Sequence, residues 1–283
     1  MPNDLLGAHI SITGGINIAI EKAKSIGCTA IQIFTSNPRS WNKKLFSEDE
    51  KKLFTQSCEQ SGIREVVAHS SYLLNIASTD KLIQTRSKNF LQYELERCES
   101  LSINTVVVHP GSKKETADKQ AFAAAANAIN YALEKNHGKT SIAIETMAGQ
   151  GSQIGARFEE LKEIYERIEN KSRVVFCMDT AHIHASGYSI GTKETFNKVL
   201  KQFDKILSLN KLKIIHMNDS KTACGSKSDR HEKIGQGTIG LEAFDAIMNN
   251  KLLEKIPKIL ETPVHSLQEY GEELKLLRSL KKA

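Results

Sequence analysis

Long apolar runs and paired cysteines are both missing from this sequence. No stretch reaches the roughly 18 consecutive apolar residues of a membrane-spanning helix. The opening residues MPNDLLGAHI lack the basic segment, apolar stretch and cleavage site of an export signal. The five cysteines are far apart and form no Cys-x-x-Cys pair, which argues against a disulfide framework or a thiolate zinc finger. We therefore expect a cytoplasmic protein with no membrane association.

Flexible linkers, low-complexity tracts and an extreme net charge are absent as well. Because no Pro- or Ser-rich boundary interrupts the chain, we expect one domain over residues 1–283. This length lies just above the roughly 250 residues of a typical (β/α)8 barrel. The net charge of +6 suits an anionic partner but is too small to demonstrate one.

Apolar runs recur along the chain and alternate with segments of helical spacing. The runs are continuous, which is typical of parallel strands covered on both faces. They lie at residues 5–9, 29–34, 64–69, 104–109, 141–145, 173–179, 212–218 and 257–261. The helical segments lie at residues 17–27, 48–62, 86–103, 119–138, 157–170, 194–210, 241–250 and 266–283. This alternation predicts an α/β fold, a single closed (β/α)8 TIM barrel, rather than a doubly wound open sheet.

Six of these runs carry, at or near their C-terminal end, a residue that can bind a metal ion. These residues are His69, His109, Glu145, Asp179, His216 and Glu261. Because the carboxyl ends of barrel strands open onto one face, the six side chains are expected to converge on a single mouth. Burying three carboxylates there without cations would be costly, since like charges repel. The pattern therefore predicts a polynuclear metal site at the C-terminal face of the barrel.

Three further residues extend the predicted metal site. His182 follows Asp179 by three residues, in the loop expected after that strand. Asp229 and His231 lie two apart, a spacing that presents both to one side of an extended segment. Together with His182 they could form a separate three-ligand site beside the first. Imidazole and carboxylate ligands without thiolate suit zinc, manganese or non-haem iron.

Several segments carry these residues in an order that resembles a known enzyme family. They are HSSYLLNIAS, VVVHPGS, AIETMAGQGSQIG, CMDTAHIHASGY, HMNDSK, GSKSDRHEKIGQGTIG and ILET. Their residues and spacing resemble the motifs of endonuclease IV, the metal-dependent abasic-site nuclease of DNA base excision repair. The likeness runs over almost the whole chain, from GAHISITGG to ILETP. It implies the fold of that family, a xylose isomerase-like TIM barrel.

The resemblance also implies three bound metal ions, usually Zn²⁺, with Mn²⁺ as an alternative at one position. His69 and His109 would bind one ion and share Glu145 with a second. The second ion would also be bound by Asp179, His216 and Glu261. The third ion would be bound by His182, Asp229 and His231. All nine positions hold the residue type that the family uses.

The reaction and the substrate follow from the same resemblance. The expected reaction is hydrolysis of the phosphodiester bond 5′ to an abasic site in double-stranded DNA, which leaves a 3′-hydroxyl and a 5′-deoxyribose phosphate. An activated hydroxide would attack phosphorus, with Glu145 as the catalytic residue that orients it and cations stabilising the leaving group. A 3′-end-cleaning phosphodiesterase activity is expected as well. We expect a monomer that needs no protein partner.

Loop residues are expected to contact the DNA. Arg39 matches a family loop that enters the minor groove, and Tyr72 and Leu73 match residues that wedge into the base stack opposite the extruded sugar. Lys227 and Arg230 are expected to contact phosphates. Without the resemblance, Tyr72 and Leu73 would be interpreted as packing at the barrel rim.

The chain differs from the usual family pattern at Pro38, Ser70 and Ala181. None of these is a proposed ligand, so they concern the grip on DNA and the surroundings of the ligands rather than the reaction class. His9 ends the first strand and is expected to contact a ligand. The remaining histidines are expected in loops or at the surface, namely His137, His184 and His265.

Two other functions fit part of the pattern. A sugar isomerase or epimerase uses the same barrel and the same ligand types around one or two divalent ions. A small polyol, however, would not need loop residues such as Arg39 and Tyr72. A nonenzymatic DNA-binding protein with structural metals is not expected to share carboxylates between open sites. The endonuclease is therefore the favoured hypothesis.

Overall fold

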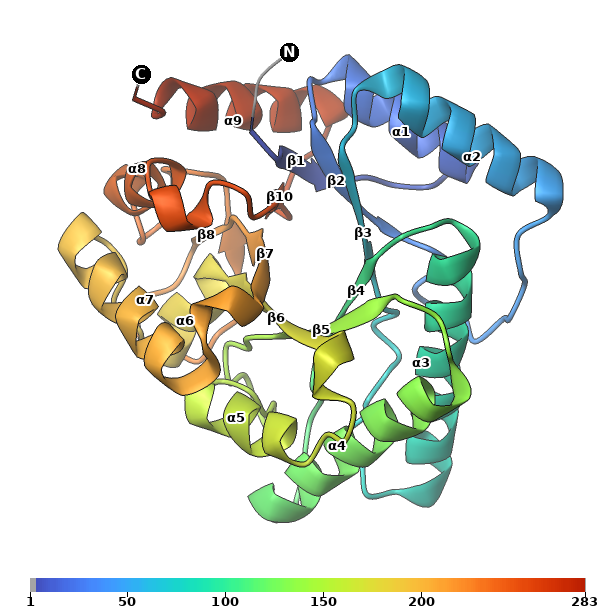
Figure 1. Cartoon of the computed structure of the whole chain (residues 1–283). Coiled ribbons are helices and arrows are strands. Elements are labelled where there is room, and N and C mark those ends of the chain that lie inside the picture. Colours follow the sequence, from blue (N-terminus) through green and yellow to red (C-terminus); the bar gives the residue numbers. More distant parts are fainter. Residues whose placement is uncertain (1–3, 283) are drawn as a thin grey trace.

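A computed structural model describes residues 4–282, and this part of the chain forms a closed parallel barrel (Figure 1). The strands follow one another around the barrel in the order β1-β10-β7-β6-β5-β4-β3-β2, and β1 pairs with β2 to close it. Their bounds are Leu6–His9 (β1), Ala30–Phe34 (β2), Glu65–His69 (β3), Thr105–Val108 (β4), Ser141–Glu145 (β5), Val174–Asp179 (β6), Leu212–His216 (β7) and Lys258–Leu260 (β10). The predicted barrel is confirmed, and each strand falls inside its predicted range.

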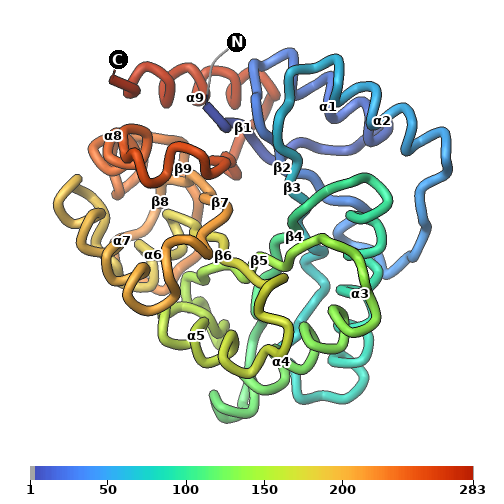
Figure 2. Tube along the Cα trace, viewed as in Figure 1, coloured from blue at the N-terminus to red at the C-terminus, as the bar shows by residue number. Residues whose placement is uncertain are grey.

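Helices surround the barrel and cover its outer face (Figures 1 and 2). The α-helices are α1 (Ile16–Ser25), α2 (Glu48–Ser61), α3 (Lys81–Ser100), α4 (Asp118–Lys135), α5 (Phe158–Glu166), α6 (Thr180–Ser186), α7 (Lys193–Leu207), α8 (Leu241–Met248) and α9 (Leu267–Ser279). Short 3-10 turns are η1 (Lys171–Arg173), η2 (Leu209–Lys211) and η3 (Lys251–Leu253). Two short strands outside the barrel, β8 (Asp219–Ser220) and β9 (His231–Glu232), pair antiparallel. Between residues 4 and 282, no helix is long and apolar enough to span a membrane.

Capping side chains explain where two of the helices begin. At α2 the Ser47 hydroxyl accepts a hydrogen bond from the Glu50 backbone, and the Glu50 carboxylate accepts one from the Ser47 backbone. At α3 the Asp80 carboxylate accepts hydrogen bonds from the backbone N–H groups of Leu82 and Ile83, in the first turn of the helix. For this reason α3 begins at Lys81, earlier than the predicted start at residue 86.

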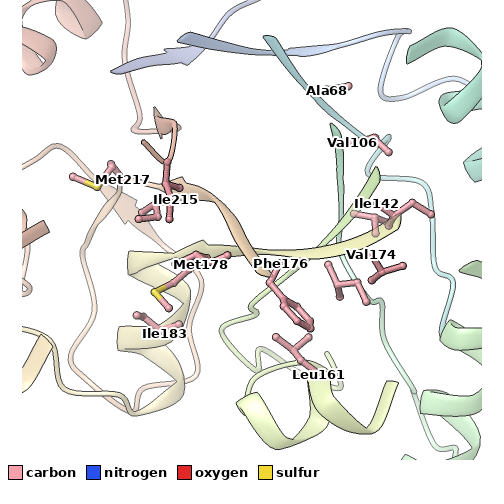
Figure 3. Close-up of a cluster of buried hydrophobic side chains, with 14 of the residues drawn as sticks. Ala68, Val106, Ile142, Leu161, Val174, Phe176, Met178, Ile183, Ile215 and Met217 are labelled. Carbon is pink, nitrogen blue, oxygen red and sulfur yellow. The ribbon is translucent and has the colours of Figure 1, made fainter. Parts of the chain in front are cut away.

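The barrel has an inner and an outer apolar layer. The inner layer consists of Ala30, Val67, Val107, Ala143, Val175, Cys177, Ile214 and Ile259. Residues between these on the same strands point outward, as Figure 3 shows for Phe176 of β6, which is directed toward Leu161 of α5. Since side chains alternate along a strand, the residue two positions after each inner-layer residue also points into the barrel. The inner layer therefore sets the direction of the side chains at the strand ends.

Candidate metal centre

The strand ends bring six predicted ligands together inside the barrel mouth. They are His69, His109, Glu145, Asp179, His216 and Glu261. Each lies two positions after an inner-layer residue, as His69 follows Val67 and His216 follows Ile214. The side chain of His109 is 30% exposed and that of Glu261 is 17% exposed, while the others are buried. The cluster is thus a buried group of imidazoles and carboxylates with one side open to solvent.

Glu145 lies at the centre of this cluster and is fully buried. Its Oε2 is 3.3 Å from His69 Nε2 and 3.1 Å from His109 Nε2. Its Oε1 is 2.9 Å from His216 Nδ1 and 3.3 Å from His182 Nδ1. One carboxylate therefore faces histidines from two sides, as a ligand shared between two ions would.

A second group adjoins Glu145. His216 Nδ1 lies 3.3 Å from Glu261 Oε2 and 3.8 Å from Asp179 Oδ2. Glu145, Asp179, His216 and Glu261 each offer a ligand atom, and these four atoms lie within 4.8 Å of one another. Such a spacing allows one ion to contact all four residues.

The third group is built from a helix and a loop. Asp179 accepts a hydrogen bond from the backbone of His182 at 2.8 Å and caps α6, so the segment expected to be a loop is helical. His182 Nε2 lies 3.2 Å from Asp229 Oδ2, and His231 Nε2 lies 3.3 Å from Asp229 Oδ1. His231 Nε2 is also 3.8 Å from Asp179 Oδ2. The third group, His182, Asp229 and His231, therefore adjoins the second group through Asp179.

Backbone carbonyls fix the ring orientation of three histidines. His69, His182 and His231 place Nδ1 at 2.7, 2.8 and 3.1 Å from a backbone carbonyl oxygen. Because a carbonyl only accepts, Nδ1 carries the hydrogen and, in the neutral ring, Nε2 keeps its lone pair. That nitrogen faces carboxylates, and Nε2 of His231 is buried with no hydrogen-bond partner. A lone pair held beside carboxylates fits a bound cation.

Burial and neighbouring charges set the pKa values in the cluster. Burial alone would raise the pKa of Glu145, but the charge of His216 helps to hold it well below its usual value. Burial lowers the pKa of His182, yet the charge of Asp179 and nearby hydrogen bonds raise it well above its usual value. Against the effect of burial, the charge of Asp179 helps to raise the pKa of His231 to about 9. Without cations the cluster balances its carboxylates with protons, which bound cations would displace.

Comparison with known proteins places the chain in a family. A family model described as a xylose isomerase-like TIM barrel matches residues 20–280. The "Probable endonuclease 4" of Geotalea daltonii is 40% identical over 281 residues, which is 99% of either chain. The "Apurinic-apyrimidinic endonuclease" of Caenorhabditis elegans is 40% identical over 281 residues, which is 98% of this chain and 70% of that protein. The chain belongs to the endonuclease IV family.

Solved structures agree with this assignment. The endonuclease IV of Thermus thermophilus superposes on this family member with a TM-score of 0.86 at 32% identity, covering 97% of this chain and 98% of the other. A D-tagatose 3-epimerase-like protein superposes with a TM-score of 0.75 at 18% identity, covering 97% of this chain and 96% of the other. At that identity the second likeness concerns the fold alone.

Polar residues that sequence reasoning did not place among the ligands also lie in the mouth of this endonuclease IV family member. His9 Nδ1 is 3.2 Å from Glu261 Oε1, which confirms that His9 contacts a predicted ligand. Cys177 Sγ lies within 4.8 Å of a ring nitrogen of His216, and burial raises the pKa of Cys177 to about 12, which favours the neutral thiol. Gln32 is fully buried and contacts both Glu261 and His216. Its signal in the sequence is a single polar residue in the apolar run TAIQIF.

The mouth opens as a cavity of about 1040 Å³ whose wall contains predicted ligands and predicted DNA-contacting residues. Arg39 and Tyr72 line it, and Tyr72 is 62% exposed. Leu73, beside Tyr72, is half-buried. Lys227 and Arg230 are exposed on the loop that carries Asp229. An aromatic side chain thus lines the cavity, and exposed cations lie on the loop whose Asp229 also lines it.

Helix α3 anchors the loop that carries Arg39. The Thr35 hydroxyl donates a hydrogen bond to the buried Glu94 carboxylate, and the Arg97 guanidinium donates to the Thr35 carbonyl. Arg97 also lies over the Phe46 ring, 3.8 Å from its centroid. Both ends of the segment between β2 and α2 are therefore held by one helix face. A further bond, from the Ser71 hydroxyl to the Pro38 carbonyl at 2.7 Å, joins this loop to the one that carries Tyr72.

The sequence predicts that the remaining histidines lie in loops or at the surface, and for one of them this prediction is wrong. His137 and His265 are exposed, as the sequence suggested. His184 is instead buried, because α6 is buried over all of residues 180–185, and its Nε2 is 3.1 Å from Thr238 Oγ1. The position of α6 could not be foreseen once the segment after Asp179 was interpreted as a loop.

Proposed function

We propose that this chain is an endonuclease that hydrolyses the phosphodiester bond 5′ to an abasic site in double-stranded DNA, leaving a 3′-hydroxyl and a 5′-deoxyribose phosphate. The observation that carries the proposal is the convergence of nine ligand-type side chains, with Glu145 among them, at one mouth. The names of two relatives, an endonuclease 4 and an apurinic-apyrimidinic endonuclease, support the same reaction. A 3′-end-cleaning phosphodiesterase activity would use the same site.

Three Zn²⁺ ions are proposed for this centre, with Mn²⁺ as an alternative at one position. One would be held by His69, His109 and Glu145. A second would share Glu145 and be held by Asp179, His216 and Glu261. The third would be held by His182, Asp229 and His231. When bound, such cations would supply Lewis-acid charge for phosphate oxygens and lower the pKa of nearby water.

Glu145 is proposed as the catalytic residue. Contacts with four imidazole rings restrict rotation of its carboxylate. The pKa of Glu145 lies well below its usual value, in part through the charge of His216 and despite burial, so the side chain stays a hydrogen-bond acceptor at neutral pH. A carboxylate held in one orientation can accept a hydrogen bond from the attacking water. That hydrogen bond directs a lone pair of the water oxygen at phosphorus.

The rim would recognise the DNA. Tyr72 and Leu73 are proposed to insert into the base stack, where a missing base lowers an unstacking cost of a few kcal/mol per step. The extruded sugar would enter the cavity of about 1040 Å³. Arg39 would enter the minor groove, while Lys227 and Arg230 would contact phosphates. These contacts come from one chain, and we propose that the protein acts as a monomer.

Incision of a synthetic duplex tests the proposal. Purified protein is incubated with a duplex carrying one tetrahydrofuran abasic analogue and with the same duplex undamaged. We expect a single cut on the 5′ side of the analogue, none in the undamaged duplex, and loss of the cut in a Glu145→Gln variant. Failure of the metal-loaded protein to cut, or full cutting by the variant, would refute the proposal. Conversion of ketoses by the same preparation would favour the epimerase alternative.

A further inference from the structure

Two of the barrel strands, β1 and β2, contribute no predicted metal ligand to the cluster at the barrel mouth. The corresponding inward-facing residues are His9 at the end of β1 and Gln32 on β2. Gln32 lies two positions after the inner-layer residue Ala30, as the predicted ligands do on their own strands. It is fully buried, so its amide must find partners inside the barrel mouth.

The Gln32 amide joins two predicted ligands of one ion. Its Nε2 donates to Glu261 Oε1 at 2.5 Å and lies 3.0 Å from His9 Nδ1. Its Oε1 lies 2.8 Å from His216 Nε2. A carboxylate only accepts, so the amide nitrogen must face Glu261 and the amide oxygen must face His216. The orientation of the amide is therefore fixed by its partners.

This orientation determines which nitrogen of His216 can bind a cation. Because Gln32 Oε1 only accepts, His216 Nε2 carries the hydrogen and Nδ1 keeps its lone pair in the neutral ring. Nδ1 is the atom that lies 2.9 Å from Glu145 Oε1 and 3.3 Å from Glu261 Oε2. Gln32 and His9 also occupy the other carboxylate oxygen of Glu261, which leaves Oε2 directed at the cluster.

His216 differs in this respect from three other histidines of the centre. The Nδ1 atoms of His69, His182 and His231 are held by backbone carbonyls, which no substitution at the contacting residue removes. The orientation of His216 depends on a side chain. The hydrogen-bond partners of metal-binding histidines typically change metal affinity 10–100-fold when they are removed.

We propose that Gln32 is a positioning residue for the metal site formed by Glu145, Asp179, His216 and Glu261. It presents His216 Nδ1 and Glu261 Oε2 to one cation in a single geometry. This inference rests on the metal centre proposed above and concerns the affinity of one ion position within it.

The test compares zinc release from three proteins. The wild type, Gln32→Met and Ile214→Val are loaded with Zn²⁺ and titrated with a chromophoric chelator, and urea unfolding of each apoprotein checks the fold. Met matches the length of Gln and removes both hydrogen bonds, while Ile214→Val alters packing one layer below His216 without touching a polar contact. We expect one equivalent of zinc to be released about 10–100-fold more readily in Gln32→Met, with the other equivalents unchanged. The Ile214→Val protein should behave like the wild type.

The possible results separate this inference from the proposed function. Wild-type affinity for every equivalent in Gln32→Met would overturn the role of Gln32 and leave the metal centre intact. Equal weakening in Gln32→Met and Ile214→Val would overturn it too, because packing alone would then be responsible. A wild type that holds no zinc would overturn the centre itself. Long-range ¹H–¹⁵N spectra of the zinc-loaded wild type need no variant: the Nε2–H form of His216 is expected, and the Nδ1–H form would contradict the assignment.

Discussion

Substitution of Arg97 by Met should destabilise the protein and loosen the loop that carries Arg39. Arg97 is 5% exposed, and its guanidinium donates to the Thr35 carbonyl and to the Tyr93 hydroxyl, the latter at 3.1 Å. The neighbouring Glu94 is 1% exposed, and the charge of Arg97 offsets part of the rise in its pKa that burial causes. Removing the guanidinium leaves the buried Thr35 carbonyl without its charged donor and Glu94 without the nearby positive charge, which typically costs about 1 to 3 kcal/mol.

Urea unfolding of Arg97→Met, Glu94→Gln and the double variant measures this cost. The unfolding midpoint of Arg97→Met should fall with an unchanged slope, and the double variant should recover at least about 1 kcal/mol relative to the sum of the single effects. In steady-state incision, the KM for the abasic duplex should rise roughly tenfold with little change in kcat. The reason is that the loop must then be ordered on binding, which makes the binding free energy about 1.4 kcal/mol less favourable. A loss of stability below about 1 kcal/mol, or strictly additive effects, would refute the reasoning.

Three other outcomes are expected. Burial, together with the nearby charge of Lys281 and against the charges of Asp4 and Glu254, lowers the pKa of Lys258 to about 8. Relative to Lys258→Met, wild-type stability should therefore rise by about 3 kcal/mol as pH increases from 8 toward 10.5, since the buried ammonium is penalised only while it is charged. A flat difference between the two urea midpoints over this range would contradict this. Tyr72→Ser should weaken binding to an abasic duplex but not to an intact one, as measured by fluorescence anisotropy, and equal weakening of both would remove its wedge role. The affinity for duplex should fall steeply with salt, and Lys227→Ala should reduce the log–log slope by about 1, whereas an unchanged slope would exclude a phosphate contact there.

The sequence was sufficient to predict the barrel and the convergence of the cluster. Continuous apolar runs mark strands covered on both faces, and parallel strands in a barrel end at one face. From these two rules alone, His69 and His216 were expected to meet although they lie 147 positions apart in the chain (216 − 69). Their approach to Glu145 in the structure agrees with that expectation.

What could not be predicted depends on contacts that no local pattern encodes. Asp179 caps α6 through a contact only three residues away, but its place beside His216 depends on closure of the barrel. Gln32 gave no ligand signal, because an amide in an apolar run is more often a buried polar residue with ordinary partners. Two of its partners, Glu261 and His216, lie far away in sequence and meet it only through closure of the barrel.

Removal and return of metal tests the central claim most directly. The protein is stripped with a chelator, Zn²⁺ is added back stepwise, and incision of the tetrahydrofuran duplex is measured against zinc per chain by elemental analysis. We predict no incision by the stripped protein and recovery that is complete only when about three ions per chain are bound, as a three-ion hydrolytic centre requires. Full incision by protein that holds less than one metal ion per chain would contradict the account.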